Sequence, residues 1–117
     1  MMADLLFLTG IGFLFAHELD AIQQKEWRFF FRPALLSDET GYMLFTALHG
    51  PLVVLFVWLW DDATFQLVLD VFLIGHAGVH GLLRGHPLIN FDGWFSRLWI
   101  YGGAVIGAVH LVVIGLG

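Results

Sequence analysis

Ionisable side chains recur inside the long apolar stretches of this chain. Such groups are costly within a bilayer and usually face the interior of a helix bundle, where they mark a site. Three of them are histidines in three different stretches: His17, His49 and His76 each lie eight or nine residues from the polar segment at one end of their stretch. At the helical rise, each lies about 12–14 Å below the same membrane face.

A second tier of polar residues lies nearer to that face. Asp20 is three residues after His17, and His80 is four residues after His76, so each pair shares one side of its helix. Imidazole and carboxylate groups are ligands for zinc, iron or manganese, and the chain has no cysteine to supply a thiolate. We therefore expect a divalent transition metal, zinc or iron, held by His76 and His80 with His17 or His49, while Asp20 ligates or orients a ring.

The adjacent Glu18 is the candidate catalytic group, because a carboxylate beside a bound metal serves as a general base for water. The location of the cluster in one leaflet would suit a small metal-dependent enzyme with a lipid-like substrate. Other functions stay open: a hydrogen-bond network without an ion, haem or a pigment held by histidines such as His49 and His76, or a structural subunit of a larger membrane complex.

The elements that must position these residues are four apolar stretches. Of the 117 residues, 59% are hydrophobic and 13% charged, whereas soluble domains have about a quarter charged. About 20 apolar residues in a helix cross the hydrocarbon core. We expect an all-α fold, with residues 1–117 as a single integral membrane domain in a lipid bilayer and a bundle of four spans. Their approximate ranges are 5–22, 40–60, 64–83 and 94–116, the second following an N-cap at Ser37.

The basic residues give an orientation for this bundle. All five lie in two connections, at Lys25, Arg28 and Arg32 in the first and at Arg84 and Arg97 bracketing the last. By the positive-inside rule, loops 23–39 and 84–93 are cytoplasmic and both termini are extracytoplasmic. Five cations divided between two short connections do not resemble a nucleic-acid footprint, so a nucleic-acid partner is not expected.

Further residues predict how the helices pack. Gly103 and Gly107 form a small-residue pair that allows close helix approach and leaves a homo-oligomer open. Asp70 and His110 share one depth, so we expect them to pair. Glu26, between basic neighbours, is expected to be an exposed interfacial charge.

Several of these motifs resemble those of an uncharacterised family of small bacterial multi-span membrane proteins. They are the run His17-Glu18-Leu19-Asp20-Ala21-Ile22 with the following Glu26-Trp27-Arg28, the histidine of the second span, the H-A-G-x-H motif of residues 76–80, and the segment from His86-Pro87 to Trp94. The resemblance covers most of the chain and implies a four-span bundle, which in a bacterium would lie in the inner (plasma) membrane. It implies no activity.

Overall fold

The computed structural model describes residues 1–31 and 36–117, and these form helices joined by short connections. The helices are α1 (Met2–Gln23), α2 (Trp27–Phe31), α3 (Asp38–Leu59), α4 (Ala63–Leu82) and α5 (Trp94–Leu116). The four long helices confirm the predicted all-α bundle. The bounds of α5 equal the predicted range, and those of the other three differ from it by one to three residues. The short α2 was not predicted. Arg32, one of the cations of the first basic loop, lies outside the described residues.

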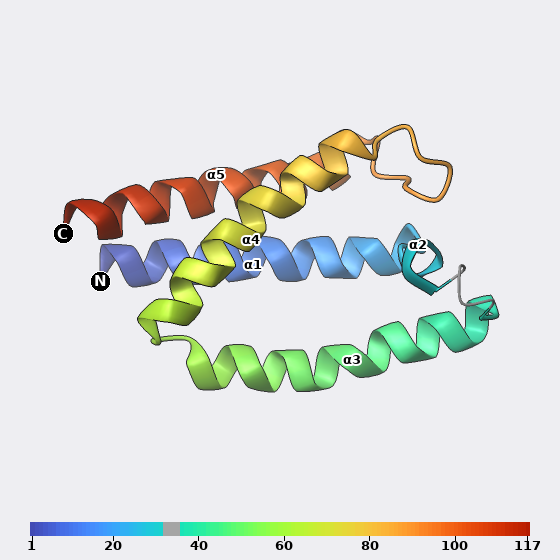
Figure 1. Ribbon diagram of the computed structural model, residues 1–117, viewed down its shortest axis with the longest axis horizontal. Coiled ribbons are helices and arrows are strands. Elements are labelled where there is room, and N and C mark those ends of the chain that lie inside the picture. The colour runs from blue at the N-terminus through green and yellow to red at the C-terminus, as the bar shows by residue number, and fades with distance from the viewer. Residues whose placement is uncertain (32–35) are drawn as a thin grey trace.

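Four of the described helices are long and apolar enough to cross a membrane: α1, α3, α4 and α5, with 20 to 23 residues each. The chain is therefore an integral membrane protein by length and composition. Both termini lie at one end of the bundle, and the end of α1, the start of α3 and the connection 83–93 lie at the other (Figure 1). Which end faces the cytoplasm stays a prediction from the loop charges.

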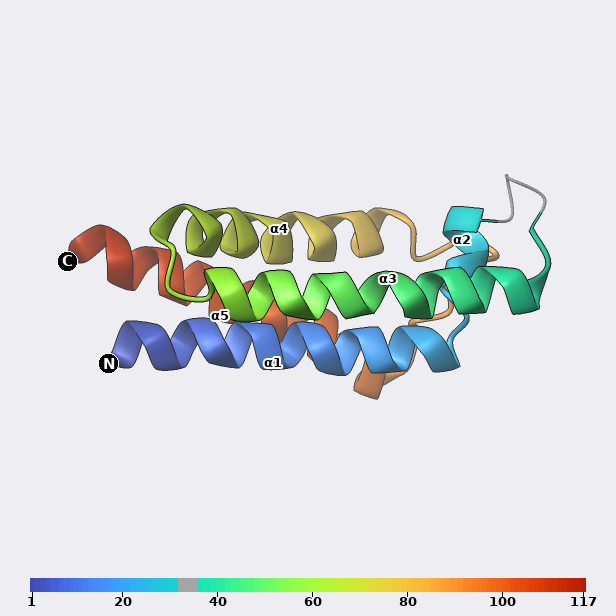
Figure 2. The same cartoon turned by 90° about the horizontal axis from the view of Figure 1, so that it is seen from below.

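The core of the bundle is the contact of α5 with α1 on one side and α4 on the other (Figures 1 and 2). Each of these helices buries residues at alternating spacings of three and four, which keeps one face toward its neighbours. The buried residues of these helices are Phe7, Gly10, Leu14, His17, Asp20 and Ala21 of α1, Leu69, Asp70, Leu73, Ala77 and His80 of α4, and Ser96, Ile100, Gly103, Gly107 and His110 of α5. His17 of α1 and His80 of α4 thus lie on the packed faces.

Glycine brings α4 and α5 close together. A Cβ at Gly107 would lie 3.2 Å from the backbone oxygen of Asp70, and one at Gly103 would lie 3.6 Å from the side chain of Leu73. Next to this approach, the His110 Nδ1 donates a hydrogen bond to Asp70 Oδ2 at 2.6 Å, with both residues almost fully buried. The predicted Asp70–His110 pair is confirmed. Gly103 and Gly107 thus allow α5 to pack closely against α4 within one chain.

The remaining span, α3, lies at the edge of the bundle (Figure 1). It begins as predicted, with the Ser37 side chain accepting a hydrogen bond from the Thr40 N–H at 3.2 Å. Its residue Phe56 contacts the rings of Phe15 on α1 and Phe65 on α4, with centroids 5.7 and 5.4 Å apart. This helix therefore touches the core through a few large side chains, and most of its surface faces outward.

At its loop end, α1 closes in a Schellman motif. The Glu26 N–H donates to the Ala21 carbonyl at 3.0 Å and the Lys25 N–H to the Ile22 carbonyl at 3.2 Å. Lys25 takes the left-handed conformation, with φ of 56°, at the position that usually holds glycine. The motif reverses the chain at once and folds Glu26 back against α1.

The residue after this turn, Trp27, anchors α2 on α3. Its ring contacts the rings of Tyr42 and Phe45, with centroids 5.5 and 6.4 Å away. It fits only because Gly41 has no side chain, since a Cβ there would lie 2.8 Å from the Trp27 Cδ1. An ion pair between Arg28 and Asp38 adds to the same contact. The chain segment that carries Glu26 is therefore fixed on both sides.

Replacing Gly107 by Leu should destabilise the bundle. Even the first carbon of the new side chain meets the backbone of α4, and overpacking of this kind costs about 1–3 kcal/mol. The melting temperature in detergent micelles, followed by the helical circular dichroism, should fall. Gly12→Leu is the matched control, because a Cβ at Gly12 has nothing within 4 Å. Equal losses for both variants would contradict the close approach of α4 and α5.

Replacing Lys25 by Gly should stabilise the protein by about 1 kcal/mol, because a left-handed conformation is unfavourable for any residue with a Cβ. The melting temperature should rise for Lys25→Gly and stay unchanged for Lys25→Ala, which removes the same charge and keeps the strain. A rise of the same size in both variants would show that charge, and not backbone conformation, is responsible.

Candidate metal centre

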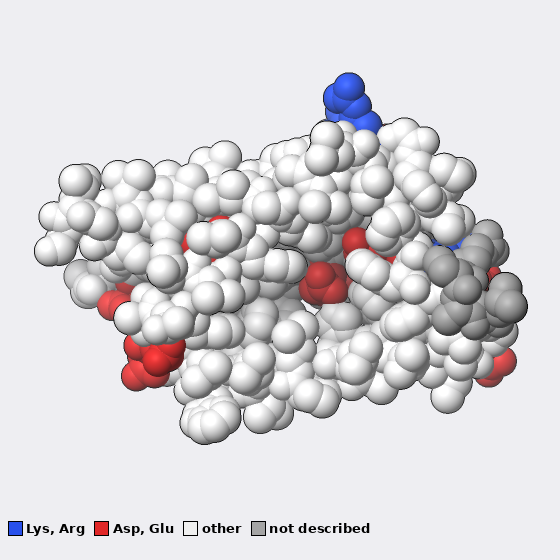
Figure 3. All heavy atoms as spheres, viewed as in Figure 1, with Lys and Arg blue, Asp and Glu red and all other residues white. Residues whose placement is uncertain are grey.

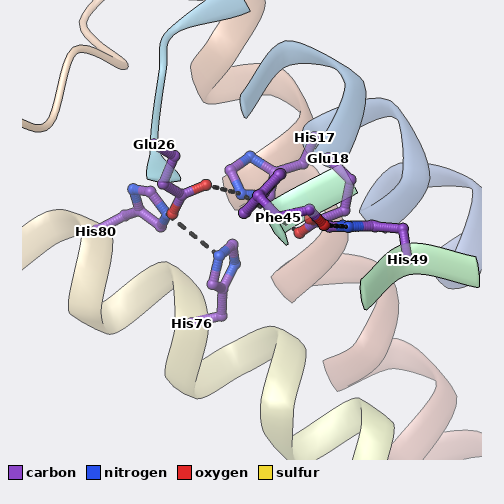
Figure 4. Close-up of polar contacts among 7 residues, drawn as sticks. All are labelled: His17, Glu18, Glu26, Phe45, His49, His76 and His80. Carbon is purple, nitrogen blue, oxygen red and sulfur yellow. Dashed lines mark hydrogen bonds and ion pairs between the residues drawn. The ribbon is translucent and has the colours of Figure 1, made fainter. Parts of the chain in front are cut away.

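Four side chains converge between α1, the turn that follows it, and α4. They are His17 from α1, Glu26 from the Schellman turn, and His76 and His80 from α4 (Figure 4). His17, Glu26 and His80 are 1%, 5% and 6% exposed, and His76 is half-buried. Three imidazoles and a carboxylate thus share one enclosed volume near the loop end of the bundle.

The nitrogen and oxygen atoms of this group are close enough for one ion, since one ligand atom from each residue lies within 4.8 Å of all the others. His76 Nε2 is 3.1 Å from His80 Nε2, His80 Nε2 is 3.4 Å from Glu26 Oε1, and His17 Nε2 is 3.5 Å from Glu26 Oε2. Zinc bonds of about 2.0–2.1 Å place tetrahedral ligand atoms about 3.3–3.4 Å apart. These three separations are close to that spacing.

Aromatic side chains enclose the group. Phe91, from the connection between α4 and α5, lies against the rings of His17 and His80, with centroids 5.2 and 4.8 Å away. Phe72 stacks on His76 at 5.3 Å. An apolar enclosure keeps water away and strengthens the electrostatic interactions inside it.

Glu26 supplies the negative charge of the group. Burial alone would raise the pKa of this carboxyl, but contacts with His17 and His80 outweigh burial and lower the pKa to about 2. Glu26 is therefore ionised at neutral pH. A buried carboxylate facing three imidazoles attracts a cation.

The ring nitrogens of His17 are a further indication of a ligand role. Its Nε2 and Nδ1 are both buried, and neither forms a hydrogen bond with any residue that the structure describes. Buried polar atoms are rarely left without a partner. Coordination of a metal by Nε2 would satisfy the nitrogen that faces Glu26.

His49 lies outside this group. Its Nε2 donates to Glu18 Oε2 at 2.5 Å, and its Nδ1 donates to the Phe45 carbonyl at 2.6 Å (Figure 4). Its depth matches that of His17, but α3 lies at the edge of the bundle and meets the neighbouring side of α1. Glu18 Oε1 is 4.0 Å from His17 Nε2, so the Glu18–His49 pair borders the candidate centre without joining it.

Asp20 is not part of the group that converges, which consists of His17, Glu26, His76 and His80. It is buried, and its Oδ1 accepts a hydrogen bond of 3.5 Å from the Gln24 side chain. Of the five predicted ligands, the structure thus brings together His17, His76 and His80. Gly75 and Gly78, on either side of His76, have nothing within 4 Å of an added Cβ, so no described helix packs closely against them.

The residue that sequence reasoning missed is Glu26. The expectation that it is an exposed interfacial charge is wrong, because its side chain is buried between His17 and His80. The basic neighbours Lys25 and Arg28 suggested a solvated cluster. The turn at Lys25, however, folds Glu26 back against α1 and buries its side chain. A usable indication was the Trp that follows Glu26, since a large ring directly after a helix end tends to anchor the turn in the core.

Comparison with known proteins places the whole chain in one group. The model of a family of unknown function, DUF6713, matches residues 3–116. No curated protein and no solved structure matches the chain. The resemblance to an uncharacterised family is thus confirmed at the level of the family: the chain belongs to the family of unknown function DUF6713.

Proposed function

We propose that this integral membrane protein binds one divalent transition metal ion, zinc or iron, through His17, Glu26, His76 and His80. The observation that carries the proposal is the convergence of these four side chains, with ligand atoms within 4.8 Å of one another in a buried volume. Three nitrogens and one carboxylate oxygen form a donor set that suits zinc and iron. This set keeps three of the ligands expected from the sequence and adds Glu26.

The four residues would fill a tetrahedral set of ligands, so Lewis-acid chemistry at this position would require the metal to take a substrate oxygen or water as an additional ligand. Glu18 is suited to accept a proton there, because its Oε1 lies 4.0 Å from His17 Nε2 and its Oε2 is held by His49. The Phe45 carbonyl in turn orients the His49 ring. This arrangement of a base and its positioning partners beside the ligands supports metal-dependent chemistry over passive storage of an ion.

The surroundings of Glu18 favour a lipid-like substrate. An apolar cavity of about 240 Å³ lies between α1, α3 and α4 with Glu18 in its wall, beside Leu14, Leu52, Phe56, Phe65, Val68, Leu69 and Phe72. Acidic atoms are visible in a hollow near the middle of an otherwise largely uncharged face (Figure 3). An alkyl chain in this cavity would bring a polar group at its end toward Glu18.

A haem or pigment ligand is less well supported. Both ring nitrogens of His49 are engaged, by Glu18 and by the Phe45 carbonyl, so this residue offers no free nitrogen to iron. A preparation without a Soret band is the expected result. A structural role in a larger complex is tested by the same metal measurement, because a scaffold needs no ion.

Elemental analysis of the full chain, purified in detergent without chelator, should find about one equivalent of a transition metal, and a ligand variant should bind it at least about tenfold more weakly. His76→Ala and Glu26→Gln are the informative variants. His86→Asn is the control, because His86 lies in the connection between α4 and α5 and accepts a hydrogen bond from the Leu88 N–H. Less than about a tenth of an equivalent in the unmodified protein would overturn the proposal.

The outlying positions should behave differently from the four ligands. His49→Ala, Glu18→Gln and Asp20→Asn are expected to retain the metal within about threefold of the unmodified affinity, because the hydrogen bonds described for these side chains go to one another, to Phe45 and to Gln24, and to none of the four ligands. Loss of a residue that holds a ligand in place would cost about 10–100-fold. Size-exclusion profiles and helical circular dichroism check that each variant folds. Loss of metal in His49→Ala with intact folding would return His49 to the ligand set and contradict the geometry proposed here.

A further inference from the structure

A second polar cavity shares a wall with the candidate metal centre. It has a volume of about 250 Å³ and lies where α4 ends, α5 begins and the connection between them folds back. His80 and Phe91 belong to both sites. The other residues in its wall are Arg84, Ile89, Asp92, Arg97, Ile100 and Tyr101.

Packing holds the walls of this cavity in place. Ile89 and Phe91 of the connection are 4% and 6% exposed, and both pack into the same buried cluster as Ile100 of α5. Two backbone hydrogen bonds shape the connection, from the His86 N–H to the Leu83 carbonyl at 2.8 Å and from the Ile89 N–H to the His86 carbonyl at 3.0 Å. The cavity therefore has a packed, buried floor at Ile89, Phe91 and Ile100, and it opens to the surface beside the exposed Arg84 and Arg97.

The charges around this cavity are unbalanced. Arg84 and Arg97 both line it, and neither forms an ion pair with a residue in the described part of the chain. Arg28, by contrast, is paired with Asp38. Asp92 is the carboxylate in the wall, which leaves an excess of one positive charge with His80 neutral. The positive end of α5 adds to this field, because Gly93 at its N-cap supplies no side-chain cap.

We propose that this cavity binds a phosphate group through Arg84 and Arg97. A guanidinium group binds two oxygens of a phosphate with two parallel hydrogen bonds. Two guanidinium groups in one cavity therefore offer enough N–H donors for the several oxygens of a phosphate. The Tyr101 hydroxyl, in the same wall, is a further donor. The phosphate belongs either to a phospholipid head or to a soluble phosphate ester, since the cavity lies at the membrane end where the loops are predicted to meet the cytoplasm.

This site does not require the metal. Its arginines would bind phosphate with or without an ion on His80, so failure of one proposal leaves the other standing. If both hold, a phosphate-bearing molecule would lie one imidazole away from the metal.

Calorimetric titration of the full chain in maltoside detergent, at one fixed ionic strength, tests the proposal. One arm uses inorganic phosphate and the other a soluble dihexanoyl phosphatidylglycerol. We expect Arg84→Gln and Arg97→Gln each to weaken binding of the preferred probe by about tenfold or more, because each variant removes hydrogen bonds between charged groups. Lys25→Gln is the control, because it removes a cation from the same end of the bundle outside this cavity.

The two arms identify the source of the phosphate. Tighter binding of the lipid indicates a phospholipid head, and equal or tighter binding of inorganic phosphate indicates a soluble ester. Binding of neither probe, or an equal loss in Lys25→Gln, overturns the proposal. Metal content, measured on the same preparations, should be unchanged in both arginine variants, and their elution profiles should match that of the unmodified protein.

Discussion

Polar groups inside a bundle of membrane helices must find partners within the protein, because lipid offers none. The packed faces of α1, α4 and α5 carry such groups at two levels. Near the ends that hold the termini, Asp70 and His110 form a hydrogen bond across the α4–α5 contact. Near the loop end, His17 and His80 meet a carboxylate that is delivered from outside the spans. The packing of α1, α4 and α5 brings these groups together at both levels.

Much of this arrangement could be predicted from the chain. Runs of apolar residues determined the number of spans, and equal depth predicted the Asp70–His110 pair. Depth alone, however, does not specify the position of a helix around the bundle. His17 and His49 lie at one level, yet α3 sits at the edge, so His49 meets Glu18 instead of the cluster.

Glu26 shows a different limit of sequence reasoning. Its burial depends on a turn in which Lys25 adopts a conformation that usually needs glycine, and on a Trp27 ring that fits against Gly41. Neither a periodicity nor a hydrophobic run reports on such a turn. The local backbone geometry, held by contacts between α2 and α3, buries Glu26 in the site although Lys25 and Arg28 lie next to it in the sequence.

The placement of these residues along the chain has a consequence for assembly. His17 lies on α1 and Glu26 in the turn that follows it, whereas His76 and His80 lie on α4, the third span. The second span, α3, contributes no member of the group. The centre is therefore incomplete until α4 has entered the membrane. An ion would be captured only after α4 had joined α1, and its capture would tie these two helices together.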